Sequence, residues 1–331
     1  MRSAWVVASL FVTGCATMGG GGSGPGAHPL APAAVVASLP LGIPPTLLAI
    51  SRDGARVVAF SSGQLSIVRT DTNIIVTTVR VAPYPTGVAI TPDGAHALLN
   101  NLSSARLAVV DLATGTLLPP IGLVVDIHPG GFGRIAVSPD GRTAYVTNQF
   151  KEYLAVVNLT AQNTLSPSLD MRPSDVTLSA DGRTLYVTGC KDFCTTGTIE
   201  ALDPKTMELI RTFSVGPGPY RFALAPDGRR GYTTNLAGPT LSVLDLTSGT
   251  VVATLPVGVE PSGLAVSPDG TRVYVANQKQ KTLTIVDAVA NAVVANVAIP
   301  SEPREIVLSP DGRRAYLSTR DALLVLDAQR L

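Results

Sequence analysis

Polar and apolar positions of the chain repeat with a period of about 43 residues. An Asp-Gly pair recurs seven times at spacings of 40 to 47 residues, with its first member at Asp53, Asp93, Asp140, Asp181, Asp227, Asp269 and Asp311. Short apolar runs that alternate with polar residues flank each pair, which is typical of half-buried β-strands. A fixed period of this length indicates a repeat architecture in which each copy is one structural unit.

The sixth copy shows the unit most clearly. The apolar run Leu264–Val266 precedes the turn Ser267–Gly270, whose Pro and Gly suit a type I turn followed by a left-handed residue. Three further strands are predicted at Arg272–Asn277, Thr282–Asp287 and Ala292–Ile299. Four short strands in each of seven copies, without helical periodicity, predict an all-β fold: a seven-bladed β-propeller.

The two ends of the repeat predict how the ring closes. The last copy has three strands before the chain ends at Leu331, and an apolar strand at residues 33–39 precedes the first copy. Pairing that strand with the last blade would complete it and remove an open sheet edge. We therefore expect one propeller domain over residues 33–331, and a monomer.

Short motifs in the second strands support this architecture. YVTNQ at Tyr145–Gln149, YVTG at Tyr186–Gly189 and YVANQ at Tyr274–Gln278 each follow an Asp-Gly turn. They resemble the YVTN family of bacterial β-propeller repeats, and the resemblance extends over about residues 33–331. Related seven-bladed propellers include lactonases, the haem d1 domain of a nitrite reductase and many binding proteins, so the resemblance implies the fold and leaves the chemistry open.

The start of the chain has the pattern of a secretory signal. A single positive charge at Arg2 and an apolar stretch precede Thr13, Gly14 and Cys15, and this end resembles the lipobox of bacterial lipoproteins. The alternative is an ordinary signal peptide that contains a cysteine. We expect a lipoprotein signal peptide at residues 1–14, a lipidated Cys15, and a Gly/Pro-rich tether at residues 15–32 without a fold of its own.

Charge argues against two classes of partner. Without Arg2 the mature chain has 24 Lys and Arg against 24 Asp and Glu, so its side-chain charge is zero. A neutral protein has no electrostatic footprint for nucleic acid or for an anionic membrane surface. We therefore expect an exported protein that acyl chains anchor to a membrane of the bacterial envelope.

The repeat itself explains many of the polar and aromatic residues. Five of the eight tyrosines occupy the fourth position after the Asp-Gly pair, which predicts packing between blades: Tyr145, Tyr186, Tyr232, Tyr274 and Tyr316. Asp or Asn ends most third strands, where its side chain can cap the following turn. A basic residue follows each Asp-Gly pair, and we interpret this ring as solvated turn charges, with an acidic partner as the alternative.

Departures from the repeat suggest a functional site at the mouth of the channel. One position in the innermost strand is occupied in order by Leu47, Gly87, Arg134, Asp175, Arg221, Gly263 and Glu305, and the preceding position adds Tyr220 and Arg304. The candidate ligand-binding residues are therefore Arg134, Asp175, Tyr220, Arg221, Arg304 and Glu305. In the alternative interpretation they are a structural brace of ion pairs, Arg134–Asp175–Arg221 with Arg304–Glu305.

Other candidate chemistry is sparse. Cys190 and Cys194 predict a disulfide in an oxidising compartment, with a redox or metal-binding thiol pair as the alternative. Asp126 and His128 could offer two metal ligands, but a structural loop is the simpler interpretation. No haem-attachment motif, nucleophile elbow or phosphate-binding loop is found, so we predict no catalytic residue, metal or cofactor.

Three functional hypotheses follow. We favour a non-enzymatic binding module that engages a protein partner or a small anionic ligand at the channel mouth. A lactonase-like hydrolase is the alternative that the resemblance implies, although the mouth offers Asp175, Glu305 and arginines but no histidine. A purely architectural envelope lipoprotein is the third.

Overall fold

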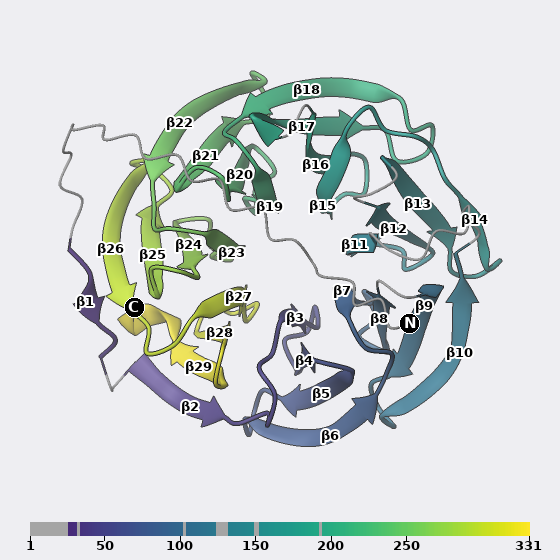
Figure 1. Cartoon of the computed structure of the whole chain (residues 1–331), viewed down its shortest axis with the longest axis horizontal. Coiled ribbons are helices and arrows are strands. Elements are labelled where there is room, and N and C mark those ends of the chain that lie inside the picture. The colour runs from purple at the N-terminus through teal and green to yellow at the C-terminus, as the bar shows by residue number, and fades with distance from the viewer. Residues whose placement is uncertain (1–25, 32–33, 102–103, 124–131, 149–151, 192–193) are drawn as a thin grey trace, which may run out of the picture.

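Seven antiparallel sheets surround a central channel in the computed structural model (Figure 1). The structure describes residues 26–31, 34–101, 104–123, 132–148, 152–191 and 194–331. Within each of blades 1 to 6 the four strands run outwards from the channel in chain order. The predicted seven-bladed propeller is confirmed.

Each blade contributes one strand to each of four concentric layers. The innermost strands of blades 1 to 7 are β3 (Leu47–Ile50), β7 (Pro85–Ile90), β11 (Phe132–Val137), β15 (Arg172–Leu178), β19 (Pro219–Leu224), β23 (Pro261–Val266) and β27 (Pro303–Leu308). The second strands are β4 (Arg56–Ser61), β8 (His96–Asn101), β12 (Thr143–Asn148), β16 (Leu185–Lys191), β20 (Arg230–Asn235), β24 (Arg272–Asn277) and β28 (Arg314–Thr319).

The two outer layers complete the blades. The third strands are β5 (Gln64–Arg69), β9 (Ser104–Asp111), β13 (Tyr153–Asn158), β17 (Thr196–Leu202), β21 (Thr240–Asp245), β25 (Thr282–Asp287) and β29 (Leu323–Asp327), which a 3-10 turn η3 (Ala328–Arg330) follows. The outermost strands are β6 (Ile74–Arg80), β10 (Thr116–Gly122), β14 (Asn163–Leu165), β18 (Leu209–Val215), β22 (Thr250–Pro256), β26 (Ala292–Ala298) and, in blade 7, β2 (Val35–Leu39).

Strand β2 closes the ring as the sequence predicts. It pairs antiparallel with β29 and so becomes the outer strand of blade 7, whose other three strands come from the C-terminal end of the chain. A two-residue strand was not expected: β1 (His28–Pro29), in the predicted tether, pairs in parallel with β26 at the outer edge of blade 6 (Figure 1). Leu30 extends this contact by donating its N–H to the Ala298 carbonyl at 3.2 Å.

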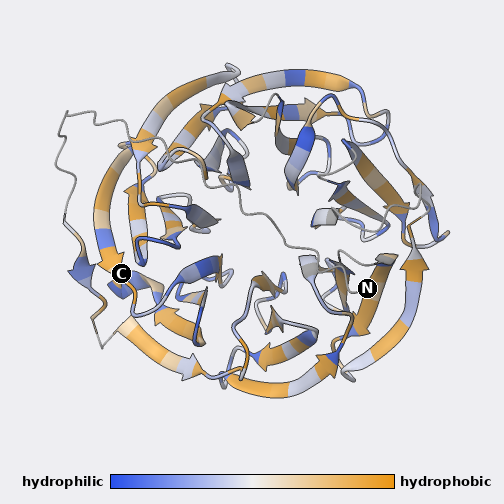
Figure 2. Cartoon of the chain, viewed as in Figure 1, coloured by the Kyte–Doolittle hydropathy of each residue, from blue (hydrophilic) through white to orange (hydrophobic). Residues whose placement is uncertain are grey.

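The hydrophobic core is divided among the blade interfaces. Seven buried clusters lie between neighbouring blades, from the blade 1–2 interface around to the blade 7–1 interface. The channel end of the innermost strands is more polar, and Figure 2 shows hydrophilic stretches on β15 and β27. Charged departures from the repeat therefore lie at the channel rather than in the core.

The Asp-Gly turns join the innermost and second strands of each blade and contact the neighbouring blade. In six blades a Ser or Thr hydroxyl donates to the turn Asp, and these hydrogen bonds lower the pKa of its carboxyl group: Asp53, Asp93, Asp140, Asp181, Asp269 and Asp311. In five of the turns the Gly faces the turn proline of the preceding blade: Gly54, Gly141, Gly182, Gly270 and Gly312. A Cβ added at Gly54 would lie 2.6 Å from Cδ of Pro310, across the junction of blades 7 and 1.

The propeller has two distinct faces. Connections between second and third strands, and from each outer strand to the next innermost strand, form one face, which we call the mouth face. The Asp-Gly turns and the turns between third and outer strands form the other, the turn face. No helix within the described residues has the length and apolar character needed to cross a membrane.

Candidate functional site

Four of the predicted charged side chains meet across the channel. Arg134 of β11 and Arg221 of β19 both donate to Oε1 of Glu305, which β27 supplies from blade 7. Nη1 of Arg221 also lies 3.8 Å from Oδ1 of Asp175 on β15. The ring therefore brings together residues 171 positions apart. We call Arg134, Asp175, Arg221 and Glu305 the channel cluster.

Burial strengthens the ionic contacts of the channel cluster. Asp175, Arg221 and Glu305 are 6 %, 7 % and 8 % exposed, so water screens their charges weakly. The two arginines and two carboxylates balance formally. Such a cluster keeps its charges only while the partners remain together, because an unpaired buried charge is costly.

Hydrogen bonds hold the cluster in place. The backbone N–H groups of Val176 and Phe222 each donate to one Asp175 carboxyl oxygen at 2.9 Å. Hydroxyls at one repeat position of the second strands accept the N–H groups of three cluster members, at 2.9 to 3.1 Å: Thr147 from Arg134, Thr234 from Arg221 and Ser318 from Glu305. Each charge is therefore positioned by two adjacent strands.

Two glycines at the cluster's repeat position have a packing role. A Cβ at Gly87 would lie 2.5 Å from the Gly133 carbonyl oxygen, and one at Gly263 would lie 2.6 Å from that of Arg304. These contacts are closer than real Cβ atoms allow, because the next innermost strand packs directly against the glycine. Blades 2 and 6 thus use glycine to let the strands carrying Arg134 and Glu305 approach.

Asp175 has a strongly altered acidity. Burial raises the pKa of its carboxyl group from the ordinary 3.8 to about 6, while the Arg134 guanidinium and the two backbone N–H groups act in the opposite direction. Desolvation is therefore the dominant effect on this side chain. A raised carboxyl pKa is a property that catalytic acids share with buried structural groups.

The two remaining predicted residues lie differently. Tyr220 presents its ring to Arg221, whose guanidinium carbon is 5.3 Å from the ring centroid, a cation–π geometry. Arg304 forms no ion pair with Glu305, contrary to the pairing that the brace interpretation assumes, because Arg134 and Arg221 bind that carboxylate. Within the described part of the chain, the buried Nε atoms of Arg221 and Arg304 have no hydrogen-bond partner.

A cavity of about 770 Å³, which we call the mouth pocket, opens on the mouth face between blades 4, 5 and 6. Its lining is mainly apolar and includes a few polar side chains. The lining residues are Arg172, Pro173, Ser174, Cys190, Cys194, Gly218, Pro219, Tyr220, Leu236, Ala237, Glu260, Ser262 and Gln278. Only Tyr220, Cys190 and Cys194 were singled out from the sequence, because the others become neighbours only when the ring brings blades 4, 5 and 6 together.

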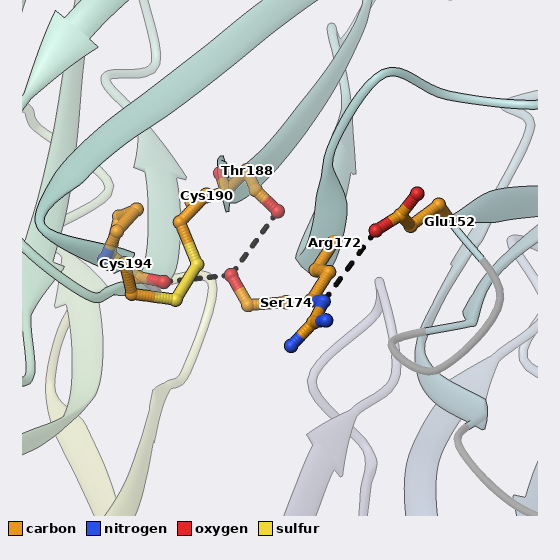
Figure 3. Close-up of a disulfide and its surroundings, with 7 residues drawn as sticks. Glu152, Arg172, Ser174, Thr188, Cys190 and Cys194 are labelled. Carbon is orange, nitrogen blue, oxygen red and sulfur yellow. Dashed lines mark hydrogen bonds and ion pairs between the residues drawn. A yellow bond between two sulfur atoms is a disulfide. The ribbon is translucent and has the colours of Figure 1, made fainter. Parts of the chain in front are cut away.

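Cys190 and Cys194 form a disulfide at one wall of this pocket (Figure 3). Cys190 ends the buried part of β16, and the Cα atoms of the two residues are 4.9 Å apart. Nearby, the Ser174 hydroxyl donates to the carbonyls of Thr188 at 3.1 Å and Pro219 at 2.8 Å. The hydrogen bond to Pro219 joins blade 4 to blade 5 beside the pocket.

Several candidates lie outside the described residues or away from this site. Cys15, Asp126 and His128 are outside the described ranges. His28 is exposed in β1, and His96 begins β8 at the turn face. Among the residues that the structure describes, no three His, Cys, Asp or Glu side chains are grouped so as to hold a metal ion.

Comparisons with known proteins agree with the fold. A model of the YNCE-like β-propeller family matches residues 166–312. No curated protein matches the chain in sequence. Among solved structures, hydrazine synthase from Kuenenia stuttgartiensis is similar, with a TM-score of 0.75 and 21 % identity over 87 % of this chain and 97 % of that chain.

A second structure shows how widely this architecture is shared. The β-propeller domain of Cps50 (Swd1) from Myceliophteria thermophila has a TM-score of 0.75 and 13 % identity, covering 88 % of this chain and 98 % of its own. At these identities the likeness concerns the fold alone. The YVTN-type resemblance is confirmed at the level of the propeller: the chain is a seven-bladed β-propeller in which residues 166–312 match the YNCE-like β-propeller family.

Proposed function

We propose that the protein is a lipid-anchored, non-enzymatic binding module of the bacterial envelope that engages a protein partner on its mouth face. The mouth pocket carries this proposal, since a cavity of about 770 Å³ with a mainly apolar lining and a few polar side chains has the character of a binding site. Three blades and a disulfide build the pocket, so its shape is preorganised. Preorganisation lowers the entropic cost of binding.

Exposed apolar side chains on the same face favour a protein as the partner. Ile43, Tyr84, Leu236 and Val259 are 37 %, 69 %, 39 % and 47 % exposed, and all four lie in mouth-face connections. Exposed apolar groups gathered on one face are typical of interaction surfaces. A partner that covers this face would place one of its own apolar side chains in the pocket.

A small anionic ligand is the second candidate. The unpartnered Nε donors of Arg221 and Arg304 support it, since a carboxylate could accept from either. The ion pairs of the channel cluster weigh against it, because Glu305 already occupies the guanidinium groups of Arg134 and Arg221. These contacts favour the interpretation of the cluster as a brace.

Site-specific photo-crosslinking tests the partner proposal. A photoreactive phenylalanine analogue at Leu236 should give a discrete adduct in intact cells, whereas the same analogue at Val289 should give none. Val289 is 75 % exposed but lies on the turn face, which makes it a matched control. The purified adduct partner should bind the wild-type propeller, and a Leu236→Trp variant that fills the pocket should weaken binding at least tenfold.

Other outcomes would replace the proposal. Equal adducts at both positions would mean non-specific contact, and no adduct at any mouth-face position would favour the architectural role. A lactone and carboxylate screen covers the remaining hypotheses. Hydrolysis that Asp175→Asn abolishes would favour a lactonase-like enzyme, which the raised pKa of Asp175 would suit.

Membrane attachment is tested separately through Cys15. Acyl chains on this cysteine would anchor the protein stably, since two or more chains hold where one does not. The Cys15→Ala variant should leave the membrane fraction or accumulate as the unprocessed precursor, with Cys190→Ser as a cysteine control that stays anchored. Wild-type protein that is wholly soluble and begins beyond residue 15 would contradict the anchor.

A further inference from the structure

A tyrosine fills the turn-face end of five of the seven blade interfaces. Tyr145, Tyr186, Tyr232, Tyr274 and Tyr316 are all at most 8 % exposed. The Tyr145 hydroxyl donates to the Pro204 carbonyl at 3.2 Å, and that of Tyr274 donates to the Ala328 carbonyl at 3.4 Å. Both acceptors lie just beyond the third strand of the next blade: Pro204 is two residues after β17, and Ala328 directly follows β29.

Blades 1 and 2 lack this tyrosine, and they differ in what replaces it. Val58 of blade 1 packs in one cluster with Leu112, which follows β9 and is 3 % exposed. Leu98 of blade 2 also packs in one cluster with Leu159, which follows β13, but Leu159 is only partly buried where Leu112 is fully buried. The blade 2–3 interface is therefore left open at its turn-face end.

A cavity of about 620 Å³ occupies this place, and we call it the blade 2–3 slot. Leu98, Val109, Leu118 and Ile121 supply apolar walls, and Leu159 lines it from blade 3. Asp93, His96, Asp140 and Gln162 add polar groups from the surrounding turns and strand ends. The cavity extends towards β10, whose pairing with β9 shifts register between Leu118 and Ile121. On the side of blade 3 the outer strand, β14, has only three residues.

Equivalent cavities that contain the tyrosine are smaller. The one beside Tyr232 measures about 350 Å³ and the one beside Tyr274 about 280 Å³, and the same kinds of turn line both. These cavities occupy equivalent places and can be compared directly. The slot, where leucine replaces the tyrosine, is about twice as large as either cavity that contains a tyrosine ring.

We propose that the blade 2–3 slot is a binding site for a small phenolic molecule. The ring would lie against Leu98 and the apolar residues of β9 and β10, and the phenol hydroxyl would donate to the Leu159 carbonyl. Tyr145 and Tyr274 satisfy the corresponding carbonyls in this way. Charged Asp-Gly turns surround the slot, which suits a small molecule better than a protein surface. The site is independent of the mouth pocket, which lies on the opposite face.

Calorimetry with p-cresol on the purified propeller tests the site. The wild-type protein should bind p-cresol, and toluene should bind about three- to tenfold more weakly because it leaves the carbonyl without a donor. Leu98→Tyr supplies the ring covalently, so it should raise the melting temperature and weaken p-cresol binding at least tenfold. Leu98→Met conserves volume and should retain binding.

The other outcomes separate the remaining explanations. If Leu98→Tyr fails to fold, Leu118→Trp fills the slot from the outer strand and should give the same loss of binding. No p-cresol binding at millimolar concentration, or equal binding by wild type and the slot-filling variant, would overturn the site. Tighter binding of N-acetyltyrosinamide than of p-cresol would mean that the slot binds a tyrosine side chain of a protein partner and not a free small molecule. Leu236→Trp in the mouth pocket should leave p-cresol binding unchanged.

Discussion

A chain that begins at Pro40 should be far less stable than one that begins at Ala31. The shorter chain lacks β2, whose five residues complete blade 7. Its loss removes the ladder to β29 and the cover over Val325 and Leu323, which are fully buried. We expect a loss of about 3–5 kcal/mol in the free energy of unfolding. Thermal unfolding should show a drop on the order of 10 °C, with aggregation through the exposed β29 edge.

The chain that begins at Ala31 is itself the matched control. It lacks β1, which pairs with β26 over two residues only, and it should melt within a few degrees of the full mature chain. Equal melting temperatures for the chains beginning at Ala31 and Pro40 would mean that β2 contributes little to closure.

Arg221→Ala should destabilise the fold by about 3–5 kcal/mol, because it removes one partner from a buried ionic cluster. Asp175 would lose its nearest guanidinium, and Glu305 would keep only Arg134. Arg320→Ala is the matched control: its pair with Glu302 spans 3.6 Å at the surface and should contribute less than about 1 kcal/mol. Chemical denaturation of both variants measures the difference.

The opposite pattern would assign the cluster to ligand binding. An Arg221→Ala variant with an unchanged melting temperature and weaker binding of a carboxylate compound would mean that the arginine serves a ligand rather than the fold. Asp175→Asn provides a second control through pH. The folded protein holds the Asp175 proton between about pH 4 and pH 6, where the unfolded chain has lost it. The contribution of Asp175 to stability therefore falls as pH rises through this window, and asparagine removes that slope.

The fold could be predicted from the sequence because each repeat consists of short patterns of neighbouring residues. Turn residues, alternating strands and the extra strand at residues 33–39 each depend on neighbours in the chain, and the period sets the number of blades. The tyrosines were correctly predicted to pack between blades for the same reason. The pairing of His28–Pro29 with β26 was missed, since two residues beside a Gly/Pro-rich segment carry no strand pattern.

The candidate site was less predictable because its contacts cross the ring. One repeat position identified Arg134, Asp175, Arg221 and Glu305, but only the fold shows that Glu305 binds Arg134 and Arg221 rather than Arg304. The mouth pocket and the blade 2–3 slot depend on several blades at once. The slot did leave a trace in the sequence, namely Leu98 where five blades have tyrosine. Its meaning requires knowing that Leu159 packs against this cluster while staying only partly buried.

The pairing of β1 with blade 6 determines where the chain leaves the propeller. Twelve residues separate Cys15 from His28, so the anchor and the outer edge of β26 can be at most about 45 Å apart even if that segment is fully extended. An acylated Cys15 would thus hold the ring by its rim rather than by a face. The mouth pocket and the blade 2–3 slot open on opposite faces of the ring, whereas the tether would start at its rim. Partners could then reach both without competing with each other or with the lipid.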